Sequence, residues 1–488
     1  MANRVGSHLS LIIICRVLDV VARRSTIVTI GQTFDVIIIG GGPAGLGSAM
    51  HLAEKGIAVL LLEKNKIGTT QKTWLTFDYI IEKYGLEESV RNRFSRVIFS
   101  CYLGNSYSFK RNDFIFPIYE ERALGLLARR AKNGGATLKD EEAFIHYTVK
   151  ENEHIKIRST KGTYLARLAV DAMGRNSPIL KSHGLKNDIL DMGCLAYFLK
   201  GVTQKNDNEL LLYDSFFPGS DYFWVVPLEN DRMMVGIFFF SPLTGSNLKE
   251  KTERLKWYIE AKHIKGNVYD MRMGNIPLGP QSQVHIDHFI SIGDSCNTPL
   301  PSSGFSFSRC LEESKVLADF VAKHLNDKAP IKYYRKAILG EKIPGIEIHL
   351  IISDMLSKFT DPMLNKSIGA MNKLNEDFLI SFLTGRDMSI NFAVTALRAI
   401  FNTFSLSEIR SLSLKQNYLK NLVNLYDLLL ALPQAKIREQ IVDFVKSIIK
   451  RDALLPADRR AIGLPYRSRV DQRPEKSLDT TKPNTPVC

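Results

Sequence analysis

The alternation of apolar and polar positions near the start of the chain predicts a strand, a helix and a second strand. Residues 34–39 are apolar except at one position, as in a strand that is buried on both faces. Gly40 opens a helical segment that ends near Gly56, and residues 57–63 form the next apolar run. Such a unit has a right-handed crossover, which implies a parallel sheet with helices packed on it.

Further along the chain, the pattern changes from mixed helix and strand to mainly strand. Residues 121–135 have the period of a helix that ends at a glycine pair, and residues 165–172 alternate as a strand does. From about residue 185 to 275 the pattern is β-rich, and residues 222–227 and 232–240 are its clearest strands. We interpret this part as a substrate domain that is inserted into a nucleotide-binding domain.

The nucleotide-binding pattern then returns before the chain becomes helical. Residues 289–294 form a strand, and a turn rich in proline, serine and glycine leads into a helix from about 304 to 325. Prolines among polar residues after about residue 455 are typical of a disordered tail. The expected divisions are an N-terminal extension (1–33), the first part of the nucleotide-binding domain (34–180), the β-rich substrate domain (181–275), the second part of the nucleotide-binding domain (276–328), a helical region (329–450) and the tail (451–488).

Composition and charge limit the function classes. The 488 residues are 45% hydrophobic and 24% charged, as in a globular enzyme of more than one structural unit. The net charge of +14 comes without a zinc-finger spacing, a helix-turn-helix signal or an aromatic-interleaved basic stripe. We therefore expect no nucleic-acid partner, and an acidic ligand or an anionic lipid surface suits the charge better.

The spacing of the cysteines and the length of the apolar runs indicate the compartment and the relation to membranes. Its six cysteines have no CxxC or metal-like spacing, so we expect neither a disulfide framework nor a metal site. No apolar run reaches the 18 or so residues that a spanning helix needs. We expect a cytoplasmic protein that would dock on the periphery of a membrane.

The first glycine cluster has the spacing of a dinucleotide-binding turn. Gly40, Gly42 and Gly45 follow a strand and open a helix, and Glu63 ends the next strand. The glycines would allow the tight turn, the approach of a pyrophosphate and the packing of helix on strand, and the carboxylate would bind a ribose. This motif alone is compatible with NAD or FAD.

Two later stretches decide between these cofactors. Residues 171–177 read Asp-Ala-Met-Gly-Arg-Asn-Ser, and residues 293–295 read Gly-Asp-Ser. With the first glycine cluster, they make the chain similar to the flavoprotein superfamily of the para-hydroxybenzoate hydroxylase type, which includes geranylgeranyl reductases and lycopene cyclases. The resemblance implies FAD and an α/β fold: a Rossmann-like FAD-binding domain of the glutathione reductase type with an inserted β-rich domain and a helical C-terminal region.

The resemblance also implies which residues bind FAD. Asp294 would bind the ribityl chain, the turn from Pro299 to Gly304 would present backbone amides to the flavin, and Arg122 would hold the ribityl chain or the pyrophosphate. A helix cap is the alternative role for Asp294, and a surface ion pair is the alternative for Arg122. The expected cofactor-binding residues are Gly40, Gly42, Pro43, Ala44, Gly45, Glu63, Lys64, Arg122, Asp171, Gly174, Gly293, Asp294 and Gly304.

The insertion carries an aromatic block. Tyr222, Trp224 and Pro227 match a Tyr-x-Trp-x-Phe-Pro block with which geranylgeranyl reductases line a lipid cavity, although Val226 replaces the phenylalanine. The resemblance makes these three residues the expected substrate-binding residues. Core packing is the competing interpretation.

A cyclase is the first alternative. Residues 375–389 resemble the helical end of lycopene cyclases, but residues 233–240 lack the glutamate that those cyclases use as the acid. Asp214 or Asp221 would have to supply it from another strand. A second alternative is a flavin monooxygenase or halogenase, in which Lys72 would be an active-site lysine. A flavoprotein without turnover, serving as a lipid-binding or redox-sensing module, is the third.

We therefore expect an FAD-dependent oxidoreductase that acts on an isoprenoid or other lipophilic unsaturated substrate. Hydride would pass through the flavin, as the resemblance to geranylgeranyl reductases implies. The chain has no second glycine-rich nucleotide unit, so NAD(P)H would bind transiently or a redox protein would supply electrons. The sequence assigns no catalytic residue.

Overall fold

The computed structural model describes a single unit of the chain. It covers residues 32–412, apart from residues 71, 150–153, 185–190, 204–207, 218–220, 279–284, 287, 326–333, 335–336 and 338–342. Contacts group residues 1–422 into one unit and residues 423–488 into another, so all described residues belong to the first. The expected extension up to residue 31, the tail 451–488 and the helical region beyond residue 412 lie outside the described residues.

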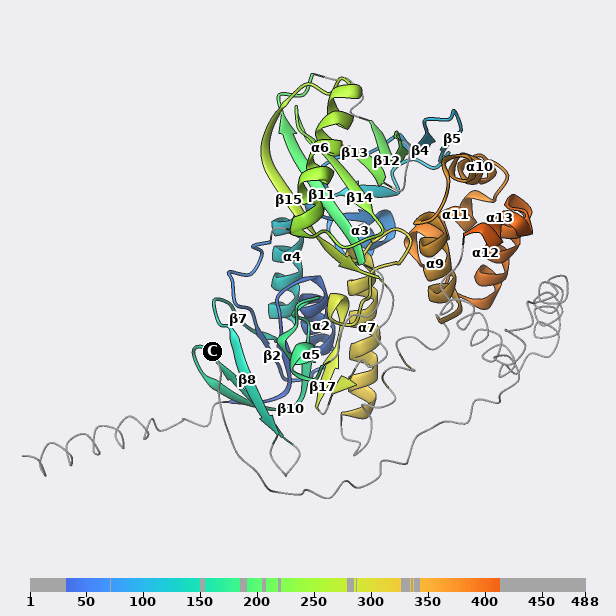
Figure 1. Ribbon diagram of the computed structural model, residues 1–488. Coiled ribbons are helices and arrows are strands. Elements are labelled where there is room, and N and C mark those ends of the chain that lie inside the picture. The colour runs from blue at the N-terminus through green and yellow to red at the C-terminus, as the bar shows by residue number, and fades with distance from the viewer. Residues whose placement is uncertain are drawn as a thin grey trace, which may run out of the picture. The chain divides into compact units, whose positions relative to one another are not determined.

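A mainly parallel sheet forms the first layer, as the apolar runs predict (Figure 1). Strand β1 (Thr33–Ile39) is parallel to β2 (Val59–Leu62) on one side and to β10 (Thr163–Asp171) on the other. The outer strands of this sheet are β7 (Thr137–Lys139), β17 (Phe289–Ser291) and β16 (His285–Ile286), with the pair β8 (Phe144–Val149) and β9 (Ile155–Ser159) attached to β10.

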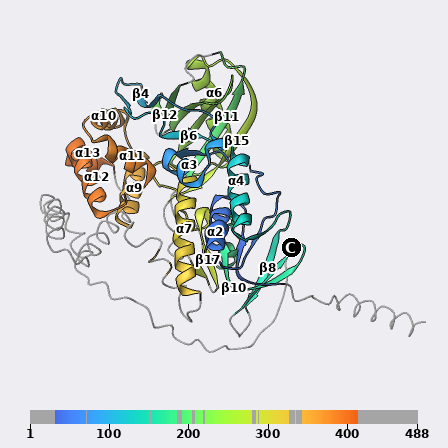
Figure 2. The ribbon, with the colours of Figure 1, turned by 180° about the vertical axis from the view of Figure 1, so that it is seen from behind.

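Helices pack on this sheet and connect its strands. They are α2 (Pro43–Glu54), α4 (Glu120–Asn133) and α7 (Phe307–His324), with the short α5 (Pro178–Ser182) near β10. Helix α2 contacts both α4 and α7, and Figure 2 shows the three helices side by side. The predicted helices at 121–135 and 304–325 are thus confirmed, within a few residues at their ends.

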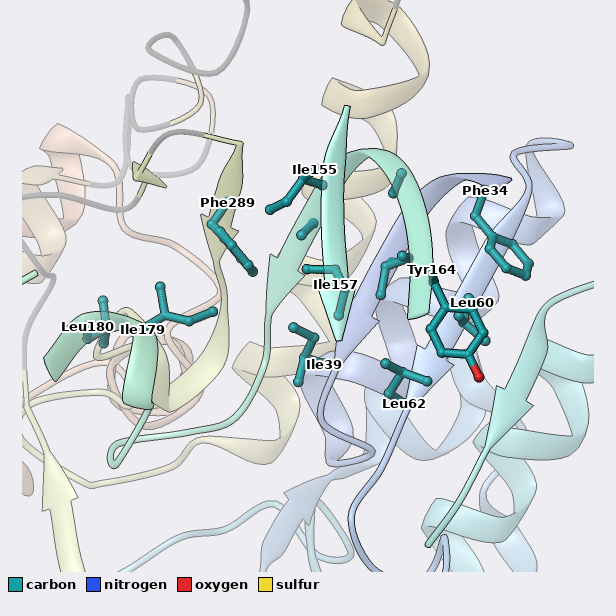
Figure 3. Packing of buried hydrophobic residues seen from close by; sticks show 13 residues of the cluster. Phe34, Ile39, Leu60, Leu62, Ile155, Ile157, Tyr164, Ile179, Leu180 and Phe289 are labelled. Carbon is teal, nitrogen blue, oxygen red and sulfur yellow. The ribbon is translucent and has the colours of Figure 1, made fainter. Parts of the chain in front are cut away.

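Residues at alternate positions of β1 and β2 pack with residues of β9 in one hydrophobic core. Ile39, Leu62 and Ile157 belong to one buried cluster with residues of α5 and β17 (Figure 3). Val36 and Ile38, on the opposite face of β1, are also fully buried. Burial on both faces is the reason that this strand is almost continuously apolar.

A second sheet contains the predicted β-rich insertion. Its strand order is β15 (Asn267–Pro277), β11 (Asp191–Lys200), β14 (Met233–Phe239), β13 (Asp221–Pro227), β12 (Glu209–Ser215), β4 (Arg96–Cys101) and β5 (Ser106–Ser108). Strands β4 and β5 lie within the range 34–180 that we assigned to the first part of the nucleotide-binding domain, so the second sheet includes strands from outside the predicted insertion 181–275. Strand β4 joins β12 across more than 100 residues, and such a long-range pairing has no local signal in the sequence.

Helix α6 (Gly245–Ala261) covers one face of the second sheet (Figure 1). Odd-numbered residues of its strands, such as Phe223, Val235 and Ile237, pack with Leu255 and Tyr258 of this helix. Strand side chains alternate between faces, so in β11, β13 and β14 the even-numbered residues point away from α6. The pairing of β12 with β13 shifts its register between Leu211 and Asp214, and Asp214 faces α6.

The remaining described elements are shorter or helical. The linkers contain β3 (Leu75–Phe77), α3 (Asp78–Tyr84), η1 (Glu87–Ser89), β6 (Ile115–Pro117) and η2 (Gly293–Ser295). The helical region contains α9 (Ile343–Leu356), α10 (Asp361–Met371), α11 (Glu376–Thr384), α12 (Ile390–Thr403) and α13 (Leu406–Ser411). Asn375 caps α11, Gly385 ends it in a left-handed conformation, and Ser389 caps α12. Within the described part of the chain, no helix combines the length and the apolar character that crossing a bilayer requires.

Candidate functional site

The first glycine cluster forms a turn whose glycines have different surroundings. Gly40 has a φ of +113°, and a Cβ there would lie 2.4 Å from the carbonyl oxygen of Ala172. A Cβ on Gly45 would lie 1.9 Å from the carbonyl oxygen of Gly40. A Cβ on Gly42 would meet no protein atom within 4 Å. Two glycines are therefore required by the chain itself, whereas Gly42 leaves space open in front of α2.

Glu63 is tied to this turn. Its Oε2 accepts a hydrogen bond from the amide of Gly41 at 2.6 Å, and its Oε1 accepts one from the amide of Asn65 at 2.9 Å. The carboxylate therefore has a fixed position at the end of β2, and each oxygen keeps a lone pair for a further donor.

Asp171 joins the two later motifs to each other. Its side chain is fully buried and accepts hydrogen bonds from the hydroxyl of Ser177 at 2.6 Å and from the amide of Met173 at 3.1 Å. The Ser295 hydroxyl accepts a hydrogen bond from the amide of Gly174. Burial raises the pKa of Asp171 to about 6. Asp171 thus supports the loops, and its side chain lines neither of the two cavities described below.

A cavity of about 450 Å³ opens in front of these loops. Its lining includes eight of the expected cofactor-binding residues: Gly40, Gly42, Pro43, Ala44, Glu63, Lys64, Gly174 and Asp294. The N-terminus of α2 has no acidic residue in its first turn, so no side chain of the helix itself neutralises its partial positive charge, which faces this cavity. The arrangement suits a phosphate-containing ligand.

Asp294 forms an ion pair inside this cavity. The Nζ atom of Lys72 lies 2.5 Å from the Oδ2 atom of Asp294, and both residues line the cavity. The negative charge of Asp294 is the main cause that raises the pKa of Lys72. The ammonium group is therefore held in its charged form beside Asp294.

Other expected cofactor-binding residues lie outside the cavity lining. Gly45 and Gly293 pack against backbone or α2, since a Cβ on Gly293 would lie 2.8 Å from Ala44 Cβ. The guanidinium of Arg122 lies over the ring of Tyr119 at 4.2 Å and donates to the carbonyl of Glu88. Gly304 lines a second cavity.

This second cavity, of about 320 Å³, is apolar. The second sheet contributes even-numbered residues such as Cys194, Trp224 and Phe238, and helices α9 to α12 contribute the opposite wall. None of its lining residues carries a charged side chain, among those that the structure describes. Trp74 and Ser306 line both cavities, so the two cavities adjoin.

The aromatic block has mixed roles. Trp224 lines the apolar cavity, and its indole lies over Gly236 of the neighbouring strand, where a Cβ would be 2.0 Å from Trp224 Cζ2. Tyr222 is buried, and its hydroxyl donates to the carbonyl of Leu356 in α9 at 2.6 Å. Neither Tyr222 nor Pro227 lines the cavity. The block thus provides one wall residue and one link to the helical region.

Sequence reasoning missed the helical wall of the apolar cavity. Phe378, Phe382 and Ile400 contribute to it from α11 and α12. Apolar residues at helical spacing were a signal for a buried face, but that pattern does not distinguish a cavity wall from packed core.

The carboxylates considered for acid catalysis lie away from this cavity. Asp214 accepts hydrogen bonds from the hydroxyls of Tyr258 and Ser100, and Lys251 binds Asp221 at 3.0 Å. Tyr258 and Lys251 are residues of α6, on the opposite face of the sheet. In the described residues, no group of His, Cys, Asp and Glu side chains is arranged to hold a metal ion.

Comparisons with known proteins agree with this architecture. Residues 35–406 match the family model described as lycopene cyclase protein. The chain is 25% identical over 371 residues to digeranylgeranylglycerophospholipid reductase 1 of Methanosphaera stadtmanae, covering 70% of this chain and 89% of that protein. It is also 25% identical to a second digeranylgeranylglycerophospholipid reductase, from Methanopyrus kandleri, covering 71% and 92%.

Solved structures share the fold. A geranylgeranyl bacteriochlorophyll reductase-like protein of Thermoplasma acidophilum has a TM-score of 0.65 at 20% identity, covering 78% of this chain and 99% of that one. A flavin-dependent brominase has a TM-score of 0.61 at 19% identity, covering 76% and 99%. The predicted resemblance to flavoproteins of the geranylgeranyl reductase and lycopene cyclase type is confirmed. Because the matched segment spans most of its length, the chain belongs to the lycopene cyclase protein family.

Proposed function

We propose that the protein is an FAD-dependent oxidoreductase that reduces double bonds of an isoprenoid lipid. The observation that carries the proposal is the uncharged cavity that adjoins the glycine-lined cavity and shares Trp74 and Ser306 with it. The names of the two related reductases support the same substrate class.

The glycine-lined cavity fits the dinucleotide half of FAD. Gly42 leaves the space that a pyrophosphate needs in front of α2, and the helix N-terminus attracts its charge. Glu63 would accept hydrogen bonds from the adenosine ribose, and Asp294 would accept them from the ribityl chain. A bound flavin supplies hydride transfer as its chemistry.

The apolar cavity would hold and orient the substrate. Phenylalanine side chains such as Phe238 and Phe378 have no hydrogen-bonding group, and the indole of Trp224 adds a wide apolar ring to the wall that an isoprenoid chain would contact. A wall that is mainly apolar and carries no charge also disfavours water, because a buried water molecule needs several polar partners. The chain thus binds the double bond in a dry environment next to the nucleotide cavity.

An anaerobic titration tests the proposal. The purified protein is reconstituted with FAD, reduced with dithionite and mixed with a geranylgeranyl lipid. Reoxidation of the flavin that saturates with the lipid, together with a product that has gained two hydrogen atoms per reduced bond, is the expected result. Failure to bind FAD, or a reduced flavin that stays reduced with every isoprenoid lipid offered, would overturn it.

Cyclisation without net redox is the second candidate, because the family model carries the cyclase name. Acid catalysis on an alkene needs a proton donor at the substrate. Asp214 and Asp221 are bound on the α6 side of the sheet, which disfavours them as that donor. Formation of a cyclic isomer of lycopene with an unchanged flavin spectrum would select this candidate instead.

Oxygen chemistry is distinguished by a separate measurement. Lys72, the residue expected for a halogenase, is paired with Asp294 in the glycine-lined cavity. We propose that the reduced protein consumes no oxygen in proportion to substrate, and that NAD(P)H or a redox protein is the electron donor. Oxygen uptake in step with substrate would favour a monooxygenase or halogenase.

A further inference from the structure

The turn between η2 and α7 lies between the two cavities. Ser302, Ser303 and Gly304 line the apolar cavity, and Ser306 at the end of the turn lines both. The amide of Gly304 donates to the carbonyl of Leu300 at 2.7 Å, which closes the turn tightly. A shift of this turn would therefore change both cavities at once.

His349 of α9 contacts this turn from the helical region. Its Nδ1 lies 2.6 Å from the hydroxyl oxygen of Ser302. Its ring stacks on Phe382 and Phe392, with centroids 4.5 Å and 5.9 Å away and an interplanar angle of 14° in each pair. The two phenylalanines fix the plane of the imidazole, and they thereby fix the point to which the Ser302 hydroxyl bonds.

Packing alone does not explain a histidine at this position. The side chain is fully buried, and its Nε2 has no hydrogen-bond partner among the described residues. Burial, with a smaller effect of the Arg309 charge, lowers the pKa of His349 to about 3, so the ring is neutral near pH 7. A buried nitrogen without a partner costs stability, and a phenylalanine or leucine would fill this aromatic site without that cost.

We propose that His349 is a positioning residue: through Ser302 it holds the turn that separates the glycine-lined cavity from the apolar cavity. The part of this inference that concerns flavin properties rests on the proposed function. A second contact also holds the turn against the helical region. Leu300 of the turn packs against Gly385, where a Cβ would lie 2.7 Å from Leu300 Cδ2. The helical region would thus set the wall that the bound flavin faces, as well as enclosing the apolar cavity.

Four variants of the full chain separate this role from packing. His349→Phe keeps an aromatic ring but removes the hydrogen bond, and Ser302→Ala removes the same bond from its other end. His349→Asn restores a polar atom near the position of Nδ1 and serves as the rescue variant. Ser353→Ala is the matched control, because this buried serine of α9 donates only to the backbone carbonyl of His349 at 2.7 Å.

Hydrogen exchange of the turn is the first readout, and it needs no cofactor. For the peptide that contains residues 297–306, His349→Phe and Ser302→Ala should each raise the exchange rate about fivefold, the factor equivalent to a hydrogen bond of about 1 kcal/mol. The double variant should exchange no faster than either single variant, since both remove one bond. His349→Asn and Ser353→Ala should stay near the wild-type rate.

The flavin spectrum and midpoint potential are the second readout, measured on protein loaded with FAD. Both bond-removing variants should shift them in the same direction, and His349→Asn should restore them. If the wild type takes up no FAD, the proposed function fails while the exchange data still decide the inference. Unchanged exchange in His349→Phe and Ser302→Ala, or effects that simply add in the double variant, would overturn the role of His349.

Discussion

Gly42 and Gly45 belong to one motif, but opposite outcomes are expected when each is replaced by alanine. A Cβ on Gly45 collides with the carbonyl of Gly40, so Gly45→Ala should lower the free energy of unfolding by about 1–3 kcal/mol.

A Cβ on Gly42 meets no protein atom within 4 Å. Gly42→Ala should therefore change stability by no more than ~0.5 kcal/mol but weaken FAD binding at least about tenfold, by intruding on the pyrophosphate. Denaturant unfolding and FAD titration of both variants check this, and equal stability losses would contradict it.

Asp171 makes stability depend on pH. Its pKa is raised from 3.8 to about 6 because the carboxylate is desolvated, which outweighs the hydrogen bonds from Ser177, Met173 and Ser295 that favour the charged form. A raised pKa means that the folded protein binds the proton more tightly than the unfolded chain does. The stabilisation is therefore complete below about pH 4 and is lost as the pH rises through about 6, with a total of ~3 kcal/mol.

Asp171→Asn isolates this contribution. The variant has no proton to lose, so its free energy of unfolding should vary less between pH 4 and pH 7 than that of the wild type. The difference between the two curves should change mainly between about pH 4 and pH 6, the interval between the pKa of the unfolded chain and the raised pKa of the folded protein. Parallel curves for the two proteins would show that Asp171 does not titrate in this range.

At the same residue scale, the spacing of glycines and carboxylates predicted local positions better than distant ones. Gly40 and Glu63 line the same cavity, because strand, turn and helix geometry alone determines their places. Arg122 lies in the first turn of α4, as expected. Its guanidinium, however, lies over the ring of Tyr119 and does not line the glycine-lined cavity. The direction of a long side chain depends on neighbours that come from other parts of the sequence, and a one-dimensional pattern does not contain them.

At the scale of elements, the pair of β13 and β14 shapes the wall of the apolar cavity. Gly236→Ala would place a methyl group where the indole of Trp224 lies, so the ring should move toward the cavity. We expect apolar ligands to bind about tenfold more weakly, as measured by fluorescence titration with an isoprenoid lipid. Gly274→Ala in β15 of the same sheet is the control, because its Cβ meets nothing within 4 Å. Equal affinities in both variants would contradict the prediction.

Elements were predictable to different degrees for a physical reason. Strands such as β1 and β14 are mostly apolar because most of their side chains are buried, so the sequence marks them clearly. Strands β4 and β5 are short and partly exposed, and β4 joins the second sheet only through its distant partner β12. Cross-strand partners of this kind are chosen by tertiary packing, so the boundary of the inserted domain was not readable from local pattern.

At the scale of the whole molecule, the helical region gives the apolar cavity its second wall. The sequence indicated helices there, and in the structure Asn375 and Ser389 act as the caps of α11 and α12. It did not indicate that these helices face the even-numbered positions of the second sheet across a cavity. Which apolar faces meet, and whether they close or leave space, is decided by packing between segments far apart in the chain.

The net charge of +14, together with the isoprenoid lipid that we propose as substrate, predicts binding to anionic membranes. Residues 1–33 and 451–488 each contribute +3, which leaves +8 on the rest of the chain. The protein should therefore co-sediment with vesicles that contain anionic lipids and much less with neutral vesicles. Because exposed charges are screened beyond about 10 Å at 0.1 M salt, binding should fall steeply as salt rises toward about 0.5 M. Truncating each end separately should lower the salt sensitivity without abolishing binding, since the remaining chain keeps most of the charge. Equal binding to neutral vesicles, or no response to salt, would contradict an electrostatic attachment and point to an apolar one.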